Sequence, residues 1–236
     1  MNEEKRHDGR SNDDLRKIKI ELGVNKNADG SCLFTWGKNI VLATVHGPKP
    51  MFPKHLSNAN KAVVDYKYRM ACFSVTERKS PVPGKRDKEI SLVSANALES
   101  AIKTELFPNT VIEVNTLILS ADAGTRVAAL SAASLALADA GIPMKGLISS
   151  VAAGRANKEL ILDLDKHEED APDAVDMACA VLMPQKEIAL LQMDGYVNIK
   201  DCEAILDQAI KGAEKVYEMQ KQVLINKYPI EGEINE

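Results

Sequence analysis

The stretch from Thr125 to Ala140 constrains the fold more than any other part of the chain. Its sequence, TRVAALSAASLALADA, is apolar around almost the whole circumference of a helix, and Gly141 followed by Pro143 is a typical helix stop. A helix without a polar face has to be covered on every side. The sequence therefore predicts a helix that is buried between two layers of other elements.

Segments on both sides of this helix supply those layers. Alternating and β-branched residues predict strands over 18–22, 30–36, 40–45, 63–68 and 110–119, and again over 147–153, 160–164, 175–183 and 188–193. Helical spacing of apolar residues predicts two further helices, at about 87–106 and 201–227. We therefore expect an α+β fold with two weakly duplicated sheet-and-helix halves around a buried central helix.

The length and composition suit a folded domain. The chain has 236 residues, of which 45% are apolar, which is enough to offset the entropy of the unfolded chain. We expect a flexible arm over 1–14, the domain over 15–228 and a polar tail over 229–236. Within the domain, Pro48, Pro50 and Pro53 predict a loop over 48–60. No apolar run is long enough to cross a membrane, and four scattered cysteines without a CxxC pair indicate free thiols in the cytoplasm.

The charge is unevenly distributed. Residues 49–88 carry ten Lys or Arg and three Asp or Glu, a net charge of +7. Residues 159–176 carry eight acidic residues and one Lys, a net charge of −7. Such a pairing suits an enzyme that acts on a polyanion, with one region binding phosphates and the other holding a metal or moving a proton. Two solvated surfaces are the alternative.

The segment Ala121–Arg126 (ADAGTR) joins a predicted strand to the buried helix. The first N–H groups of a helix attract anions, Gly124 permits close approach, and Thr125 and Arg126 add donors that suit phosphate. Alternatively, Thr125 only caps the helix and Arg126 pairs with Asp122.

The acidic segment Glu168–Met177 (EEDAPDAVDM) leads into another predicted strand. Asp176 shares a strand face with Ala178 and Ala180, so its carboxylate can reach into a cleft. With Asp170 it could hold a hard divalent cation, or one of the two could act as a general acid. A charged turn is the alternative.

A proline- and glycine-containing loop carries two basic pairs, Arg78-Lys79 and Lys85-Arg86. These pairs are suited to contact a nucleic-acid backbone, although solvated loop charge would look the same.

Taken together and in order, these segments resemble the RNase PH family, and within it the catalytic type of subunit of the archaeal exosome. The resemblance covers nearly the whole chain. Besides the segments above, it includes RHDGR at 6–10, ADGS at 28–31, YRMACFS at 68–74, ERK at 77–79, SLALADAGIP at 134–143 and LLQMDG at 190–195.

The resemblance implies an RNase PH-like fold and a phosphorolytic 3′→5′ exoribonuclease. In such enzymes inorganic phosphate attacks the terminal phosphodiester and releases a nucleoside 5′-diphosphate, and the reverse reaction adds nucleotides.

The resemblance also implies roles for particular residues. Asp176 would be the essential acid or metal ligand, and Asp170 would help it to hold Mg²⁺ or Mn²⁺. The phosphate-binding turn would consist of Ala123, Gly124, Thr125 and Arg126. Lys85 and Arg86 would grip the RNA near its 3′ end, and Lys54 would line an RNA entry pore.

Two positions depart from the pattern of the family. Many relatives have two glycines at 123–124, where this chain has Ala123-Gly124, which leaves the backbone donors in place. Lys85 stands where arginine is usual, which keeps the charge but loses the bidentate fork.

The resemblance further implies partners. Catalytic subunits of the exosome type alternate with an inactive paralogue in a ring of six, and RNA-binding cap subunits sit on the ring. A homohexamer that matures tRNA 3′ ends and a non-catalytic RNA-binding scaffold are the two competing hypotheses.

Overall fold

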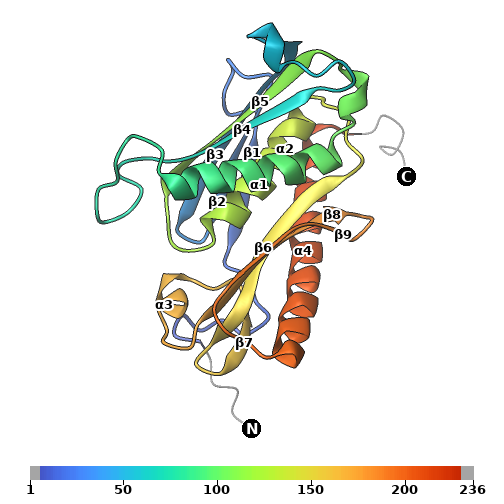
Figure 1. Cartoon of the computed structure of the whole chain (residues 1–236). Helices are drawn as coiled ribbons and strands as arrows, with labels where there is room; N and C mark the ends of the chain where they lie inside the picture. The colour runs from blue at the N-terminus through green and yellow to red at the C-terminus, as the bar shows by residue number, and fades with distance from the viewer. Residues whose placement is uncertain (1–5, 230–236) are drawn as a thin grey trace.

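A computed structural model describes residues 6–229 of the chain and contains two sheets, with the N-terminal strands in one and the later strands in the other (Figure 1). The first sheet has the order β1-β2-β3-β5-β4 and is antiparallel except for β4 and β5, which run parallel. Its strands are β1 (Ile18–Leu22), β2 (Gly30–Trp36), β3 (Asn39–Pro50), β4 (Val63–Met70) and β5 (Thr110–Ser120). Helix α1 (Lys85–Ala101) packs against β4.

The second sheet has the order β7-β6-β8-β9 and is antiparallel throughout. Its strands are β6 (Leu147–Ala156), β7 (Glu159–Leu162), β8 (Val175–Met183) and β9 (Glu187–Asp194). The long closing helix α4 (Ile199–Lys227) packs along β6, β7 and β8. Three short helices lie in connections: η1 (Lys54–Leu56), η2 (Thr104–Leu106) and α3 (Lys166–Glu169).

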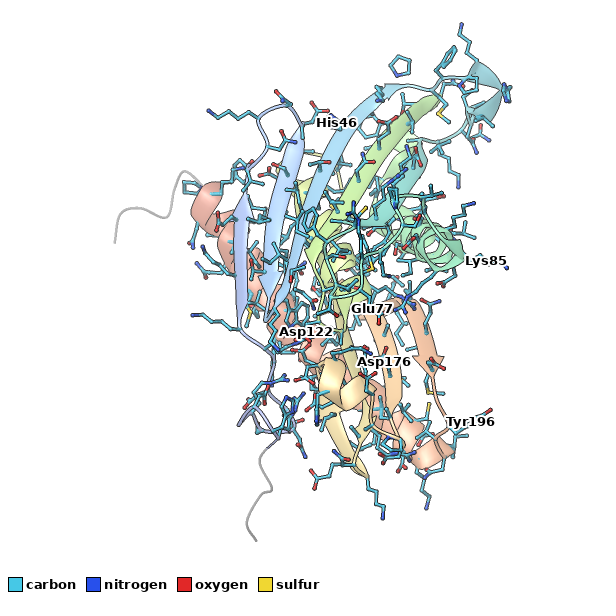
Figure 2. All side chains as sticks on the ribbon, turned by 90° about the vertical axis from the view of Figure 1, so that its left-hand side faces the viewer. His46, Glu77, Lys85, Asp122, Asp176 and Tyr196 are labelled. Carbon is cyan, nitrogen blue, oxygen red and sulfur yellow. The ribbon has the colours of Figure 1, made fainter. Side chains whose placement is uncertain are left out.

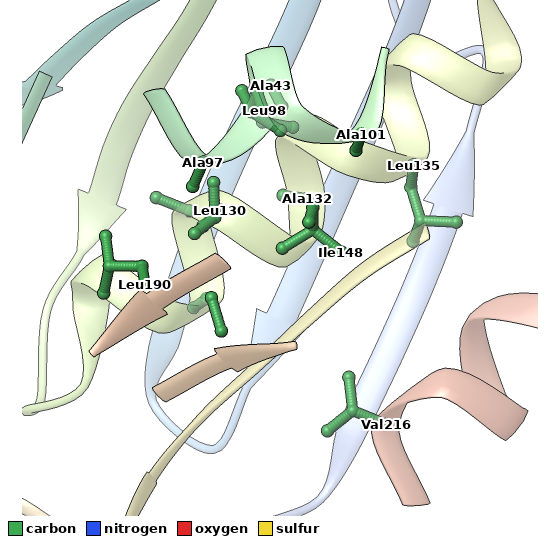
Figure 3. Close-up of a cluster of buried hydrophobic side chains, with 14 of the residues drawn as sticks. Ala43, Ala97, Leu98, Ala101, Leu130, Ala132, Leu135, Ile148, Leu190 and Val216 are labelled. Carbon is green, nitrogen blue, oxygen red and sulfur yellow. The ribbon is translucent and has the colours of Figure 1, made fainter. Parts of the chain in front are cut away.

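The central helix α2 (Thr125–Asp139) joins the two halves. Twelve of its fifteen residues are buried, and it contacts β2, β3 and β5 of one sheet and β6 and β8 of the other. Figure 3 shows Leu130, Ala132 and Leu135 of this helix among side chains from both halves. The predicted α+β arrangement around a buried central helix is therefore confirmed.

Small residues let α2 approach the strands closely. A Cβ on Gly30 would lie 2.3 Å from the backbone oxygen of Ala136, so only glycine fits where β2 crosses the helix. On the other side, the hydroxyls of Ser131 and Ser134 accept hydrogen bonds from the backbone N–H groups of Ser150 and Ile148, at 3.0 and 2.8 Å. The two serines thus tie the helix to β6 and satisfy these two backbone N–H groups.

Most boundaries agree with the sequence analysis, but the proline-rich region does not. β3 continues to Pro50, and the short η1 follows it, where a loop was expected over 48–60. Pro48 lies in the irregular step of the β3–β5 pairing between His46 and Lys49, where a missing N–H is tolerated. The first amphipathic helix ends at Ala101 instead of near residue 106, and α3 was not anticipated.

The structure also differs from the flexible arm that was expected over 1–14. Residues 1–5 lie outside the described part of the chain, but residues 6–14 are anchored to the second half. Arg6 is 9% exposed, and its guanidinium binds the carboxylate of Glu168 (Nε to Oε1, 2.6 Å) and the carbonyl oxygen of Leu162 (2.8 Å). A polar sequence looked flexible because its partners lie more than 150 residues away. Of the expected tail, only Pro229 is described.

The carboxylate of Asp163 links the two halves. It is fully buried just after β7 and accepts hydrogen bonds from the backbone N–H of Arg16 (2.6 Å), from its guanidinium Nη2 (2.6 Å) and from Nε1 of Trp36 (2.8 Å). Its φ of 57° is left-handed, a conformation that Asp and Asn tolerate better than most residues. No helix among residues 6–229 is long and apolar enough to span a bilayer.

Asp163→Asn keeps the size of the side chain and the backbone conformation but removes the charge that faces Arg16. Because a buried guanidinium without its counter-charge is costly, we expect the free energy of unfolding to fall by about 3–5 kcal/mol. The matched control is Asp170→Asn, which breaks an exposed pair with Lys166 and should cost less than about 1 kcal/mol. Denaturant unfolding followed by the fluorescence of Trp36, the only tryptophan, measures both. Equal losses would contradict a special role for Asp163.

Candidate active site

The turn between β5 and α2 presents backbone donors at the start of the central helix. Ala123 and Gly124 both have left-handed backbones, with φ of 57° and 63°. Gly124 is the N-cap and offers no side-chain cap, and Thr125 is the first helical residue, so the interpretation of Thr125 as a cap is wrong. The first N–H groups of α2 therefore carry the partial positive charge of a helix start toward the site.

Two side chains from the first half hold this turn in place. The buried amide of Asn39 donates to the carbonyl oxygen of Ala123 (2.5 Å) and accepts from the backbone N–H of Asp122 (2.6 Å). The guanidinium of Arg16 donates to the carbonyl oxygen of Asp122. The turn is thus fixed before any ligand binds, which is what efficient electrostatic stabilisation requires.

Arg126 turns away from Asp122. Its guanidinium donates to the side-chain oxygen of Gln192 on β9, and its Nη2 lies 3.9 Å from a carboxylate oxygen of Glu89 on α1. Gln192 in turn donates to Glu89 at 2.6 Å. A carboxylate oxygen of Asp122 instead lies 3.9 Å from Nη1 of Arg16 and 3.7 Å from Nζ of Lys38. The alternative in which Arg126 pairs with Asp122 is therefore wrong.

Asp176 is the second residue of β8 and faces Asp194 across the β8–β9 pairing. Burial raises the pKa of Asp176, and Asp194 adds to the shift, while Arg126 and Arg86 oppose it. Its Oδ1 is buried and has no hydrogen-bond partner among the described residues. An unpartnered buried carboxylate oxygen is costly and therefore suggests a ligand or a proton at this position.

Arg126 and Asp176 lie in one cleft. Its volume is about 320 Å³, and it is lined by Arg86, Glu89, Arg126, Asp176, Ala178, Gln192, Met193 and Asp194. Figure 2 shows Asp176 at the level where the two sheets meet, with Asp122 at the same level. Arg126 and Asp176, which are 50 residues apart in the sequence, thus meet in space. The other residues of the predicted phosphate-binding turn, Ala123, Gly124 and Thr125, are not among those that line the cleft.

The second acid of the sequence analysis, Asp170, does not line this cleft. Its exposed carboxylate accepts from Nζ of Lys166 at 2.5 Å. The preceding residue, Glu169, points the other way: burial and the nearby Asp176 raise its pKa, and the N–H of Gly124 lowers it. Successive residues of a helix point about 100° apart, so the unanticipated turn of α3 decides which of the two approaches Asp176.

Of the predicted RNA-binding residues, only Arg86 lines the cleft. Arg86, the second residue of α1, lines the cleft, whereas Lys85 lies beside it on the outer surface (Figure 2). Lys54 lies in η1, beyond the end of β3, and is not among the residues that line the cleft. Arg78 and Lys79 are exposed in the loop that precedes α1.

The sequence analysis assigned no role to several residues of this neighbourhood. They are Tyr68, Glu89, Glu169, Gln192 and Asp194. Four of them stand in segments that already carried the resemblance, YRMACFS, EED and LLQMDG; only Glu89 does not. What identifies them is contact with Thr125, Arg126 or Asp176, and a single sequence does not reveal such contacts.

Comparisons with known proteins assign the chain to a family. Residues 14–143 match the RNase PH family described as "3′ exoribonuclease family, domain 1". A match over more than half of the chain establishes the class, and the chain belongs to this 3′ exoribonuclease family.

Two curated relatives share most of their length with this chain. The chain is 51% identical to the "Exosome complex component Rrp41" of Thermococcus kodakarensis over 224 residues, which cover 95% of this chain and 90% of the relative. It is 48% identical to the protein of the same description from Archaeoglobus fulgidus over 231 residues, 97% of this chain and 89% of that protein.

Solved structures show the same fold. Rice Rrp46 superposes with a TM-score of 0.84 at 25% identity, covering 93% of this chain and 99% of that one. A chain of the Archaeoglobus fulgidus exosome, solved with RNA bound to the active site, superposes with a TM-score of 0.78 at 20% identity, covering 92% of each chain.

The burial of Asp176 makes a prediction about stability. Because burial raises its pKa, the folded state binds the proton more tightly than the unfolded chain does, and the ionised carboxylate destabilises the fold at neutral pH. Asp176→Asn should therefore raise Tm at pH 7 by about 2–4 °C. As the pH falls through the raised pKa toward the ordinary value of 3.8, the wild-type carboxyl gains its proton and the difference should vanish. Calorimetry across this range measures it, and a lower Tm for the variant at pH 7 would contradict it.

Proposed function

We propose that this chain is a phosphate-dependent 3′→5′ exoribonuclease of the exosome type, and that the cleft is its active site. One observation carries the proposal: Arg126, at the cationic start of α2, and the unpartnered carboxylate of Asp176 line the same cleft. Membership of the 3′ exoribonuclease family and relatives described as exosome components support it.

Inorganic phosphate would bind at the start of α2. The first turn of α2 supplies backbone N–H donors, of which that of Gly124 already interacts with Glu169, and Thr125 and Arg126 supply a hydroxyl and a guanidinium. The guanidinium is already held by Gln192, so little side-chain entropy remains to be lost on binding. Arg126 and Arg86 together offset the repulsion between the phosphate and the RNA.

In the forward reaction an oxygen of the phosphate attacks the phosphorus of the terminal phosphodiester. The bond from that phosphorus to the 3′-oxygen of the preceding nucleotide breaks, and the shortened RNA leaves. The terminal nucleotide departs as a 5′-diphosphate whose β-phosphate is the attacking group. The leaving 3′-oxygen needs a proton or a cation, and Asp176 is placed to deliver either one. Its raised pKa favours the protonated form that an acid requires.

Mg²⁺ or Mn²⁺ fits the same carboxylate. The buried Oδ1 of Asp176 has no partner among the described residues, and hard divalent cations prefer such oxygens. A bound cation would supply further neutralisation of phosphate charge. Asp170 is the expected second ligand, but its carboxylate binds Lys166, whereas Glu169 approaches Asp176.

RNA would reach the cleft along basic side chains. Arg86 lines the cleft and contacts the phosphates next to the 3′ end, and Lys85 adds charge at its rim. Lys54, which is not among the residues that line the cleft, suits an entry path rather than the reaction site.

The relatives' description as exosome components points to an assembly. We propose that this chain alternates with an inactive RNase PH-like paralogue in a ring of six, with RNA-binding cap subunits on top. We place it in the cytoplasm, because all four cysteines are free thiols. A homohexamer that matures tRNA 3′ ends would be active without a paralogue, and a scaffold would not need Asp176.

Co-expression with the paralogue tests the proposal. The purified ring is incubated with 3′-labelled RNA, Mg²⁺ or Mn²⁺, and either phosphate or none. We expect nucleoside 5′-diphosphates only with phosphate, and reversal when diphosphates are added. Nucleoside monophosphates released without phosphate would refute phosphorolysis. Equal activity of this chain alone as a hexamer would favour the tRNA-maturing alternative.

Two variants assign the roles within the cleft. Arg126→Ala should raise KM for phosphate by about 10- to 100-fold, because a charge-assisted contact is lost, and should leave RNA binding nearly intact. Asp176→Asn should lower kcat by about 100-fold or more without weakening RNA binding. Asp65→Asn, which removes an exposed carboxylate paired with Lys67, is the control and should change neither constant. An unchanged rate for Asp176→Asn in an assembled ring would favour the scaffold.

The second acid can be identified by a parallel pair of variants. If Asp170 is the metal partner, Asp170→Asn should raise the Mn²⁺ concentration needed for half-maximal activity by about 10-fold, and Glu169→Gln should do so less. If α3 keeps its orientation during catalysis, the order is reversed. Titration of activity with Mn²⁺ at saturating phosphate separates the two.

A further inference from the structure

Two buried hydroxyls, those of Tyr68 and Thr125, form a pair at the start of α2. The phenol oxygen of Tyr68 on β4 is 2.8 Å from Oγ1 of Thr125, the first residue of the helix. Tyr68 is 2% exposed and Thr125 is 8% exposed, so water does not compete for either oxygen. Burial raises the pKa of Tyr68, and the hydrogen bond to Thr125 and the positive charges of Arg86 and Arg126 oppose this shift.

We propose that Tyr68 is a positioning residue of the phosphate subsite, which orients the hydroxyl of Thr125 so that its proton points to the bound phosphate. This inference rests on the proposed function and adds a residue to it. Each hydroxyl has a single proton, so one of the pair donates and the other accepts. A phenol is the stronger donor, since its ordinary pKa of about 10 lies well below that of an aliphatic alcohol.

The direction of this hydrogen bond matters for the ligand. When Tyr68 donates, Oγ1 of Thr125 accepts, and the threonine proton is free for another acceptor. The backbone N–H groups of the first turn attract an anion to that end of the helix. A hydroxyl that already accepts one hydrogen bond is a stronger donor in the next, so the phenol strengthens the contact from Thr125 to phosphate.

The pair could instead be a purely structural tie between β4 and α2. The same strand provides a matched case of such a tie. Two residues earlier, the hydroxyl of Tyr66 is 2.9 Å from Oγ1 of Thr116 on β5, and both residues are buried. That pair also joins a phenol to a threonine hydroxyl, but it lies within the first sheet and away from the start of α2. Its threonine hydroxyl lies in addition 3.2 Å from the carbonyl oxygen of Lys67. A structural role predicts similar behaviour for both pairs, and a positioning role does not.

The experiment compares Tyr68→Phe with Tyr66→Phe in the assembly in which the wild-type chain is active. Tyr68→Phe should raise KM for phosphate by about 3- to 10-fold and change KM for RNA, and kcat at saturating phosphate, by less than about 2-fold. Tyr66→Phe should lower Tm by about as much as Tyr68→Phe does, but it should leave KM for phosphate unchanged. A rise in KM for phosphate in both variants, or in neither, would overturn the inference.

Removal of both hydroxyls separates positioning from stability. In a Thr125→Val background, Tyr68→Phe should raise KM for phosphate no further, because the hydroxyl that it orients is gone. Replacing both partners by apolar groups should also recover part of the lost Tm. If Tyr68→Phe raises KM by the same factor in both backgrounds, it acts by another route and the inference fails. Should Tyr68→Phe alone not fold, the double variant is compared with Tyr66→Phe/Thr116→Val in the same measurements.

Failure of the inference is distinguishable from failure of the proposed function. RNA trimming by the wild-type ring that needs no phosphate refutes the function itself. Phosphate-dependent trimming with an unchanged KM for phosphate in Tyr68→Phe refutes only the role of Tyr68. Thermal shifts with inorganic phosphate, which follow its affinity for the folded protein, check the KM values without any turnover.

Discussion

The buried carboxylate of Asp163 is the interaction on which the rest of the structure depends. It comes from the second half of the chain and accepts hydrogen bonds from Arg16 and Trp36 of the first. The same guanidinium of Arg16 reaches the carbonyl oxygen of Asp122, at the turn before α2. A carboxylate after β7 thus helps to fix the turn of the proposed phosphate site through one intervening side chain. This explains why so costly a charge pair is kept in the interior: the pair sets geometry as well as stability.

The acidic segment that contains Asp163 divides between structure and chemistry. Asp163 and Glu168 are neutralised by buried arginines, and Asp173 accepts two backbone N–H groups at the β6–β7 turn. Glu169 and Asp176 are different, because burial raises the pKa of both. The fold thus satisfies the carboxylates that hold it together and leaves two with raised pKa values near the proposed active site, of which Asp176 has an oxygen without a partner among the described residues. Perturbed carboxyl groups in a cleft are what acid–base or metal chemistry needs.

How much of this the sequence revealed depends on the range of the interaction. The all-apolar circumference of 125–140 was enough to predict a central helix between two sheets, because burial is a property of the helix itself. The turn at Ala123–Arg126 and the position of Asp176 on its strand also follow from local patterns. Asp170 and Glu169 could not be told apart, because their directions depend on α3, a single turn that Asp165 caps through the backbone N–H of Glu168. The anchoring of Arg6 was missed for the same kind of reason: its partner, Glu168, lies 162 residues away.

The burial of α2 also explains where the cleft lies. A helix that is covered on every side can meet solvent only at its ends. At the C-terminal end, the carboxylate of Asp139 accepts from the backbone N–H of Ser31 (3.1 Å) and from the hydroxyl of Tyr228 (2.9 Å), and it pairs with Lys227. The chain's own groups therefore occupy that end. The N-terminal end carries no side-chain cap and emerges beside α1, β8 and β9, where Arg86, Asp176 and Gln192 complete a cleft. The feature that dictates the core thus also leaves the first turn of α2, where the helix dipole is positive, as the end at which the proposed phosphate would bind.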